Sequence, residues 1–180
     1  MRRVLMVIGV LAIATTGVYA ALQSPAAVTG PKMQTAPTID GQLGSAEWAG
    51  AAAVGPFVLQ GGGMPSLVTE AYVGYDDDAL YIGAQLHDPM PTQVPCGATE
   101  RDGAVEADPS LAVMLDPRND GTEVMKLAVN SAGVELDAID GVVAPTVAWR
   151  SAVKIGDHGW MVEIAYLFGA GGAPQESAKW

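Results

Sequence analysis

The sequence predicts an all-β domain, an antiparallel β-sandwich of the immunoglobulin-like or jelly-roll type. Apolar residues alternate with polar or small residues in short runs, as they do in half-buried strands. Clusters of Gly, Pro, Asn and Asp separate these runs, and no run keeps a helical period for more than two turns. Many short strands bounded by turn residues are typical of two packed antiparallel sheets.

The predicted strands follow one another from the first third of the chain to its end. They are residues 57–60, 69–75, 79–87, 111–116, 124–130, 134–139, 146–155 and 160–167. Before them, residues 47–53 (EWAGAAA) are compatible with one helical turn, which Gly50, Gly55 and Pro56 keep short.

The clearest hairpin joins residues 69–75 to residues 79–87 through Asp76, Asp77 and Asp78. Short carboxylates bond nearby backbone N–H groups and tolerate the left-handed region, so turn formation explains this triplet. A metal site is the alternative, because carboxylate oxygens are also ligands of hard cations.

The length of 180 residues suits one domain with its own core. Arg2 and Arg3 precede the apolar run of residues 4–14, and small residues end at Ala20, a pattern typical of a signal peptide. We therefore expect residues 1–20 to be cleaved and the protein to be periplasmic or extracellular, with an uncleaved anchor as the alternative. Residues 21–36 are expected to be a mobile linker.

The chain is strongly acidic, with a formal net charge of −11. Removal of residues 1–20 takes away Arg2 and Arg3 and no acidic residue, which makes the net charge −13. This charge disfavours nucleic acid and anionic membrane surfaces as partners. Cys96 is the only cysteine, so no internal disulfide can form.

Several short segments follow one another in order between residues 37 and 168. They are IDG at 39–41, EW at 47–48, TEAYVGY at 69–75, DDDALYIG at 76–83, Asp88, DPSLAVMLD at 108–116, LAVNSAG at 127–133, WRSAV at 149–153 and GWMVEIAYLF at 159–168. Each alone is unspecific, but their order and spacing resemble family-9 carbohydrate-binding modules and the related DOMON-like sandwiches.

The resemblance implies a non-catalytic module that binds glycans at chain ends, in the context of polysaccharide degradation. In that family two aromatic rings clamp a terminal sugar while polar groups bind its hydroxyls. Trp149 is the preferred aromatic candidate, because Trp48 and Trp160 fit core positions better. The polar candidates beside Trp149 are Arg150, Asn130, Asp108 and Glu135.

Each polar candidate also has a structural explanation. Asn130 precedes Ser131-Ala132-Gly133, where it suits a turn, and Arg150 is a candidate ion-pair partner of Glu163. The resemblance further implies calcium, for which Asp76, Asp77, Asp78 and Glu106, together with Asp108, supply oxygens.

No catalytic motif accompanies these residues: the sequence has no GxSxG elbow and no HExxH, and His87 and His158 are its only histidines. Two other functions stay open. Some DOMON-like relatives hold haem b with Met and Lys or His as axial ligands, and the candidates here are Met90, Met114, Met125, Lys126 and His87. Met125 and Lys126 are adjacent and therefore point to opposite faces of a strand.

The third function is a protein adhesion or assembly module that binds through an edge strand or a flat face. Residues 169–180 are relevant to this function. They show no strand pattern, whereas the family's relatives have further sequence at this point that completes the sandwich. Either the module is truncated there, or a partner protein completes the sandwich.

Overall fold

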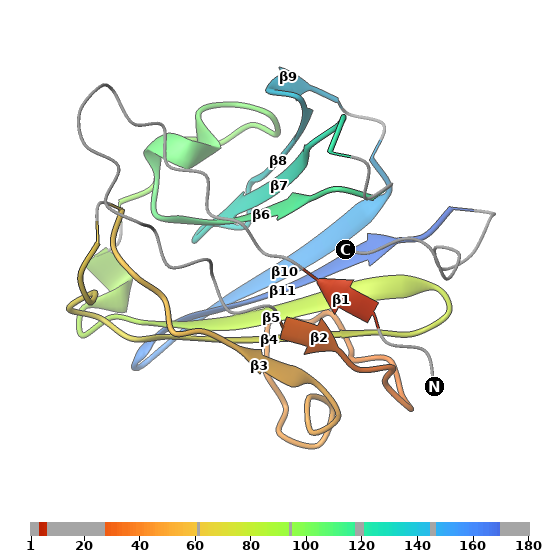
Figure 1. Ribbon diagram of the computed structural model, residues 1–180. Coiled ribbons are helices and arrows are strands. Elements are labelled where there is room, and N and C mark those ends of the chain that lie inside the picture. The colour runs from red at the N-terminus through yellow and green to blue at the C-terminus, as the bar shows by residue number, and fades with distance from the viewer. Residues whose placement is uncertain are drawn as a thin grey trace.

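The computed structural model describes residues 4–6, 28–60, 62–93, 95–117, 121–144 and 147–169. It confirms the predicted fold class: two antiparallel sheets face each other as a β-sandwich (Figure 1). In the described part of the chain the only helices are two short 3-10 helices, η1 (Pro91–Gln93) and η2 (Val105–Ala107). No helix among the described residues is long and apolar enough to cross a membrane.

The larger sheet has five strands in the order β10-β11-β5-β4-β3. Their bounds are β3 (Ala52–Val54), β4 (Thr69–Tyr75), β5 (Ala79–His87), β10 (Trp149–Gly156) and β11 (Gly159–Leu167). β11 lies between β5 and β10, and its register on β5 runs from Gly159↔His87 to Leu167↔Ala79.

The smaller sheet has the order β6-β7-β8-β9. Its strands are β6 (Ser110–Leu115), β7 (Met125–Asn130), β8 (Glu135–Ile139) and β9 (Val142–Val143). The sequence pattern located most of these strands to within one or two residues. Their side chains alternate between the core and the outer face of the sheet, and this alternation is visible in the sequence. The two-residue β9 was not predicted.

The predicted strand at residues 57–60 is wrong, and a strand lies instead at β3, where a helical turn was expected. Leu59 N–H donates to the carbonyl of Gly63 at 3.0 Å, and Gly62 N–H donates to the carbonyl of Leu59 at 2.9 Å. This turn uses local backbone groups rather than a sheet ladder, and it leaves Val58 and Leu59 exposed. The edge of β4 is taken by Ala52, Ala53 and Val54.

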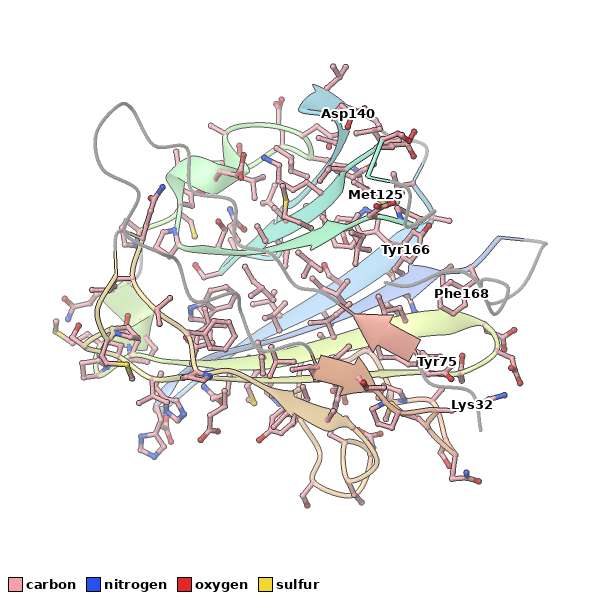
Figure 2. All side chains as sticks on the ribbon, viewed as in Figure 1. Lys32, Tyr75, Met125, Asp140, Tyr166 and Phe168 are labelled. Atoms are coloured by element: carbon pink, nitrogen blue, oxygen red, sulfur yellow. The ribbon has the colours of Figure 1, made fainter. Side chains whose placement is uncertain are left out.

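The core lies between the two sheets. Val73, Ile82, Leu127, Val162 and Ile164 are buried there and come from four strands of both sheets. Figure 2 shows Tyr75, Tyr166 and Phe168 at the same end of the sandwich as Met125. The rings of Tyr166 and Phe168 meet edge to face there, with centroids 6.0 Å apart.

A second, smaller core lies on the other face of the larger sheet, under the segment that leads to β3. It contains Trp48, which is 5% exposed, and this confirms the prediction that Trp48 is a core residue. Trp160 is likewise buried, in the main core.

Gly41 lies beside this smaller core and has a φ of 81°. A Cβ at Gly41 would lie 2.8 Å from the backbone carbonyl carbon of Val153. Glycine is therefore required at the turn that brings the IDG segment onto the sheet.

The segment before Pro37 is in contact with the sheet. β2 (Val28–Gly30) pairs with β1 (Val4–Met6), Lys32 forms a parallel bridge with Tyr75, and Met33 is buried. Ordered contacts thus begin within the predicted linker at residues 21–36. Cleavage near Ala20 stays a prediction, and residues 170–180 of the predicted tail lie outside the described residues.

Candidate functional site

A cluster of polar side chains and one tryptophan lies on the side of the sandwich where β8 faces β10. On β8, Glu135 and Asp137 pair with Val129 and Leu127 of β7, whose side chains are in the core. Residues opposite each other in a register point to the same face of a sheet. The two carboxylates therefore enter the space between the sheets, where Trp149 of β10 also lies.

Hydrogen bonds within this cluster connect the two sheets. The Trp149 indole N–H donates to Oδ1 of Asp137 at 3.2 Å. The backbone N–H and the hydroxyl of Ser151 both donate to Oε1 of Glu135, at 3.0 and 2.7 Å. Two inward-facing carboxylates of β8 are thus bound to two residues of β10.

Arg101 closes the cluster from the solvent side. Its guanidinium donates to Glu135 and to Asp137, and it lies over the Trp149 ring, 5.6 Å from the centroid. Burial of the guanidinium opposes its charge, but the hydrogen bonds and negative charges of Asp137 and Glu135 prevail and raise the pKa of Arg101. We call Arg101, Glu135, Asp137, Trp149 and Ser151 the Arg101 cluster.

The loop that carries Arg101 is fixed by its neighbour Asp102. β9 pairs with Ala138 and Ile139, and the N–H of Ala144 donates to the carbonyl of Asp137 at 2.9 Å, which leaves the N–H of Asp137 and the backbone of Glu135 for another partner. Asp102 N–H donates to the carbonyl of Glu135 at 2.9 Å, and Asp102 Oδ1 accepts the N–H of Asp137 at 3.2 Å. Asp102 has a φ of 62°, a conformation that Asp tolerates better than most residues.

Asp137 is the most buried member of the Arg101 cluster, with no exposed surface. Its Oδ1 accepts from Trp149 and Arg101, whereas its Oδ2 is buried without a hydrogen-bond partner in the described part of the structure. Buried carboxylate oxygens nearly always have a partner. This oxygen is therefore an unused acceptor inside the site.

The structure brings together two of the five predicted ligand residues, Trp149 and Glu135. Trp149 is only 8% exposed, so Arg101 and its neighbours now cover the predicted platform. Arg150 is exposed, and it points away from Trp149 because adjacent strand residues alternate.

The Glu163 partner foreseen for Arg150 is engaged elsewhere. Its oxygens accept from the Trp48 indole and from the backbone N–H groups of Asp40 and Gly41.

Asn130 and Asp108 form a separate cluster. Asn130 Nδ2 donates to Asp108 Oδ2 at 2.9 Å, and Asp108 also accepts the backbone N–H groups of Gly97 and Ala98. Asn130 Oδ1 accepts from the N–H groups of Ala132 and Val134, as a turn-forming Asn does. These bonds hold the loop over the outer face of the smaller sheet.

Three of the four residues proposed for calcium, Asp76, Asp77 and Glu106, have carboxylates engaged with other partners. Asp76 Oδ1 accepts the N–H groups of Asp78 and Ala79, and its Oδ2 accepts the Tyr81 hydroxyl at 2.8 Å. Asp77 pairs with Lys32 and Glu106 with Lys126. Within the described ranges, no three His, Cys, Asp or Glu side chains are grouped to hold a metal. Calcium binding stays a prediction.

The haem candidates are dispersed. Met125 lies in the main core, whereas Lys126 reaches Glu106 in η2, so the two side chains take opposite faces of β7 as expected. His87 lies 3.7 Å from Glu70, and Met90 is 57% exposed.

Sequence reasoning did not identify Arg101, Asp102, Asp137 or Ser151. A signal existed for Asp137, because Glu135 and Asp137 are two apart on a strand and share one face. Arg101 lies in an irregular loop, where no periodicity indicates which strand it meets.

Two solved structures of a family 9 carbohydrate-binding module (CBM9) from Caldicellulosiruptor kristjanssonii are similar to this chain. The structure in complex with cellotriose has a TM-score of 0.59 and 19% sequence identity, and the match covers 78% of this chain and 67% of that chain. The structure in complex with glucose has a TM-score of 0.60 and 19% identity, with coverages of 81% and 70%. The fold is therefore CBM9-like, as the sequence resemblance predicted.

Searches by sequence were negative. No protein-family model matches the chain, and no curated protein matches it.

Proposed function

We propose that this protein is a non-catalytic carbohydrate-binding module and that the Arg101 cluster contacts the sugar. Two findings support this function. The fold resembles modules whose structures hold cellotriose and glucose. The cluster combines a tryptophan ring with side chains that form hydrogen bonds, which is the combination that sugars require.

The observation that carries the proposal is the geometry at Trp149. The edge of its ring is fixed by Asp137, and over the ring lies the guanidinium of Arg101, whose side chain is 42% exposed. A long, partly exposed side chain can move aside, at the cost of leaving the buried Asp137 without its cation until a ligand replaces it. Movement of Arg101 would expose the ring to a sugar and free acceptors on Glu135 and Asp137 for its hydroxyls.

The finer parts of the proposal rest on the sequence. Recognition of chain ends and a role in polysaccharide breakdown are carried over from the family resemblance. A periplasmic or extracellular location rests on the predicted signal peptide at residues 1–20 and on the acidic composition of the chain. A structural calcium ion is likewise carried over from the family resemblance, with Asp76, Asp77 and Asp78 as one group of candidate ligands and Glu106 with Asp108 as another.

A glycan array of the purified chain in calcium-containing buffer tests this function, with an absorption spectrum of the same sample. We expect binding to a defined set of oligosaccharides, confirmed by calorimetry, and no haem band. Glu135→Gln should weaken binding, whereas Glu70→Gln, a surface carboxylate on β4, should not. A folded protein that binds no glycan would contradict the proposal, and a Soret band would favour the haem alternative.

A further inference from the structure

We propose that the Arg101 cluster selects sugars that carry a protonated amine, such as oligomers of glucosamine, over neutral and acidic sugars. This inference rests on the proposed glycan-binding function and specifies its ligand class. It follows from what Arg101 does in the free protein, and from what a ligand must supply when it takes the place of Arg101.

Arg101 acts as the resident cation of the site. Its guanidinium lies over the aromatic face of Trp149 and donates to both Glu135 and Asp137. Aromatic faces and carboxylates both attract cations, by the ring quadrupole and by charge respectively. The surroundings of Arg101 therefore form a cation-binding site that the chain fills with its own side chain.

The charges around the Arg101 cluster do not balance. Asp102, Glu135 and Asp137 supply three carboxylates. Among the described residues, all three form their ion pairs with Arg101. If Arg101 moves away, the fully buried Asp137 loses its counter-charge, and a buried unpaired charge is strongly unfavourable. A neutral sugar would leave this cost in place, whereas an ammonium group would remove it.

Asp137 also has an acceptor oxygen that no donor of the described structure uses. Its Oδ2 is buried and lacks a hydrogen-bond partner in the described structure, although the other oxygen has two. An ammonium has three N–H donors and can satisfy Oδ2 together with Glu135. A uronic acid would bring another carboxylate into a site that is already negative, in a chain of net charge −11.

The test is calorimetry of the whole protein with trimers of glucosamine, N-acetylglucosamine, glucose (cellotriose) and galacturonic acid. The buffer should be at about pH 6, below the pKa of an ordinary α-amino group, so that the amines are protonated. We expect the glucosamine trimer to bind at least about tenfold more tightly than its acetylated form, the equivalent of about 1.4 kcal/mol. The galacturonic acid trimer should show no binding.

Variants assign the preference to this site. Glu135→Gln should reduce the preference for glucosamine, and Asp137→Asn should reduce it further, whereas Glu70→Gln serves as the charge-matched control. Because Asp137→Asn can fail to fold, Glu135→Gln is the deciding variant, and circular dichroism checks both. In Arg101→Ala the glucosamine trimer should bind more tightly and raise the Tm more than in the wild type. Weaker binding of the glucosamine trimer to Arg101→Ala would overturn the inference that Arg101 occupies the place of the ligand's ammonium group.

The outcomes separate this inference from the proposed function. Equal binding of cellotriose and the glucosamine trimer overturns the selectivity and leaves glycan binding standing. Absence of binding to all four trimers overturns the proposed function itself. Trilysine that binds as tightly as the glucosamine trimer shows recognition of ammonium groups without the sugar, and this also overturns the inference.

Discussion

The Trp48 indole N–H donates to Oε1 of Glu163 at 2.9 Å, across the outer face of the larger sheet. The other oxygen of Glu163 accepts the backbone N–H groups of Asp40 and Gly41, both at 2.8 Å. Glu163 has no exposed surface, so its charge is solvated only by these three donors among the described contacts. One side chain of β11 thereby fixes the segment that precedes β3.

Glu163→Gln is expected to destabilise the protein by about 2 kcal/mol, in the range found for hydrogen bonds to charged groups. The NH₂ of the new glutamine would replace one of the two oxygens of Glu163, and it would then face N–H donors that it cannot accept. Urea unfolding measures the change, with Glu70→Gln as an exposed control expected to stay within about 0.5 kcal/mol. A change as small as the control would show that the three bonds to Glu163 are weak.

Gly83→Ala tests the close packing on β5 of the segment that leads to β3. A Cβ at Gly83 would lie 2.6 Å from Leu43 Cδ2 and 2.8 Å from Trp48 Cζ2. We expect a loss of about 1–3 kcal/mol, as for other overpacked positions. Gly50→Ala is the matched control, because a Cβ there meets nothing within 4 Å. Equal Tm values for the two variants would contradict this packing.

Arg101→Met is expected to cost about 3 kcal/mol, because it leaves Asp137 buried without its cation. The double variant with Asp137→Asn should lose less than the sum of the two single changes. The difference measures the coupling, which for contacting charged residues is about 1–3 kcal/mol. Strict additivity in this double-mutant cycle would mean that the ion pair contributes nothing.

Trp149→Ala is expected to lower stability by about 3–5 kcal/mol, since Trp149 is in the main core. An exposed sugar platform, the role that the sequence resemblance implies for Trp149, would instead give a loss of binding with an almost unchanged Tm. Trp149→Phe is the more useful variant, because it keeps an aromatic ring while it removes the donor to Asp137 and one ring of the indole, at a cost of about 1–3 kcal/mol. Thermal melts of both variants, compared with their glycan affinities, separate the two roles.

Acid should destabilise the protein through Asp108 and Asp76, whose pKa values are both lowered. Backbone N–H groups of Gly97 and Ala98 lower the pKa of Asp108. For Asp76, burial acts in the opposite direction, but the N–H of Asp78 and the Tyr81 hydroxyl outweigh it. A carboxylate with a lowered folded pKa contributes stability above its ordinary value of 3.8, and this is lost as pH falls through the folded pKa.

Urea midpoints measured on either side of about pH 4 check this sign, around the ordinary pKa of Asp. Asp108→Asn should flatten the decline of stability on the acid side. An unchanged slope in Asp108→Asn would show that the loop does not depend on its charge.

The predictable part of the structure was the part governed by local periodicity. Apolar residues alternate with small or polar ones in β4 and β5, which an Asp-rich turn joins. The carboxylate of Asp76 accepts the N–H groups of Asp78 and Ala79 in that turn, as predicted. The 57–60 strand was wrong because apolar character alone does not decide burial, and Val58 remains 65% exposed. Arg101 was missed because its role depends on tertiary contacts with β8 and β10.

Trp149 shows a further limit of sequence reasoning. Its identity and strand position were clear, but whether its ring faces solvent or the core depends on the packing of the other sheet. Glu135 was proposed as a ligand residue, and the spacing of two residues placed Asp137 on the same face of the strand. That this face turns toward the core became clear only from the register with β7.

The position of β11 also governs when this molecule can fold. β5 ends at His87, and the strand that completes its other side begins only at Gly159. Until β11 has been synthesised, the ladder of β5 is open on one side and Trp48 has no acceptor in Glu163. Pairings between such distant residues are slow to form. A nascent chain that stops short of β11 should therefore remain unfolded, so that the larger sheet forms only after residue 167 has been synthesised.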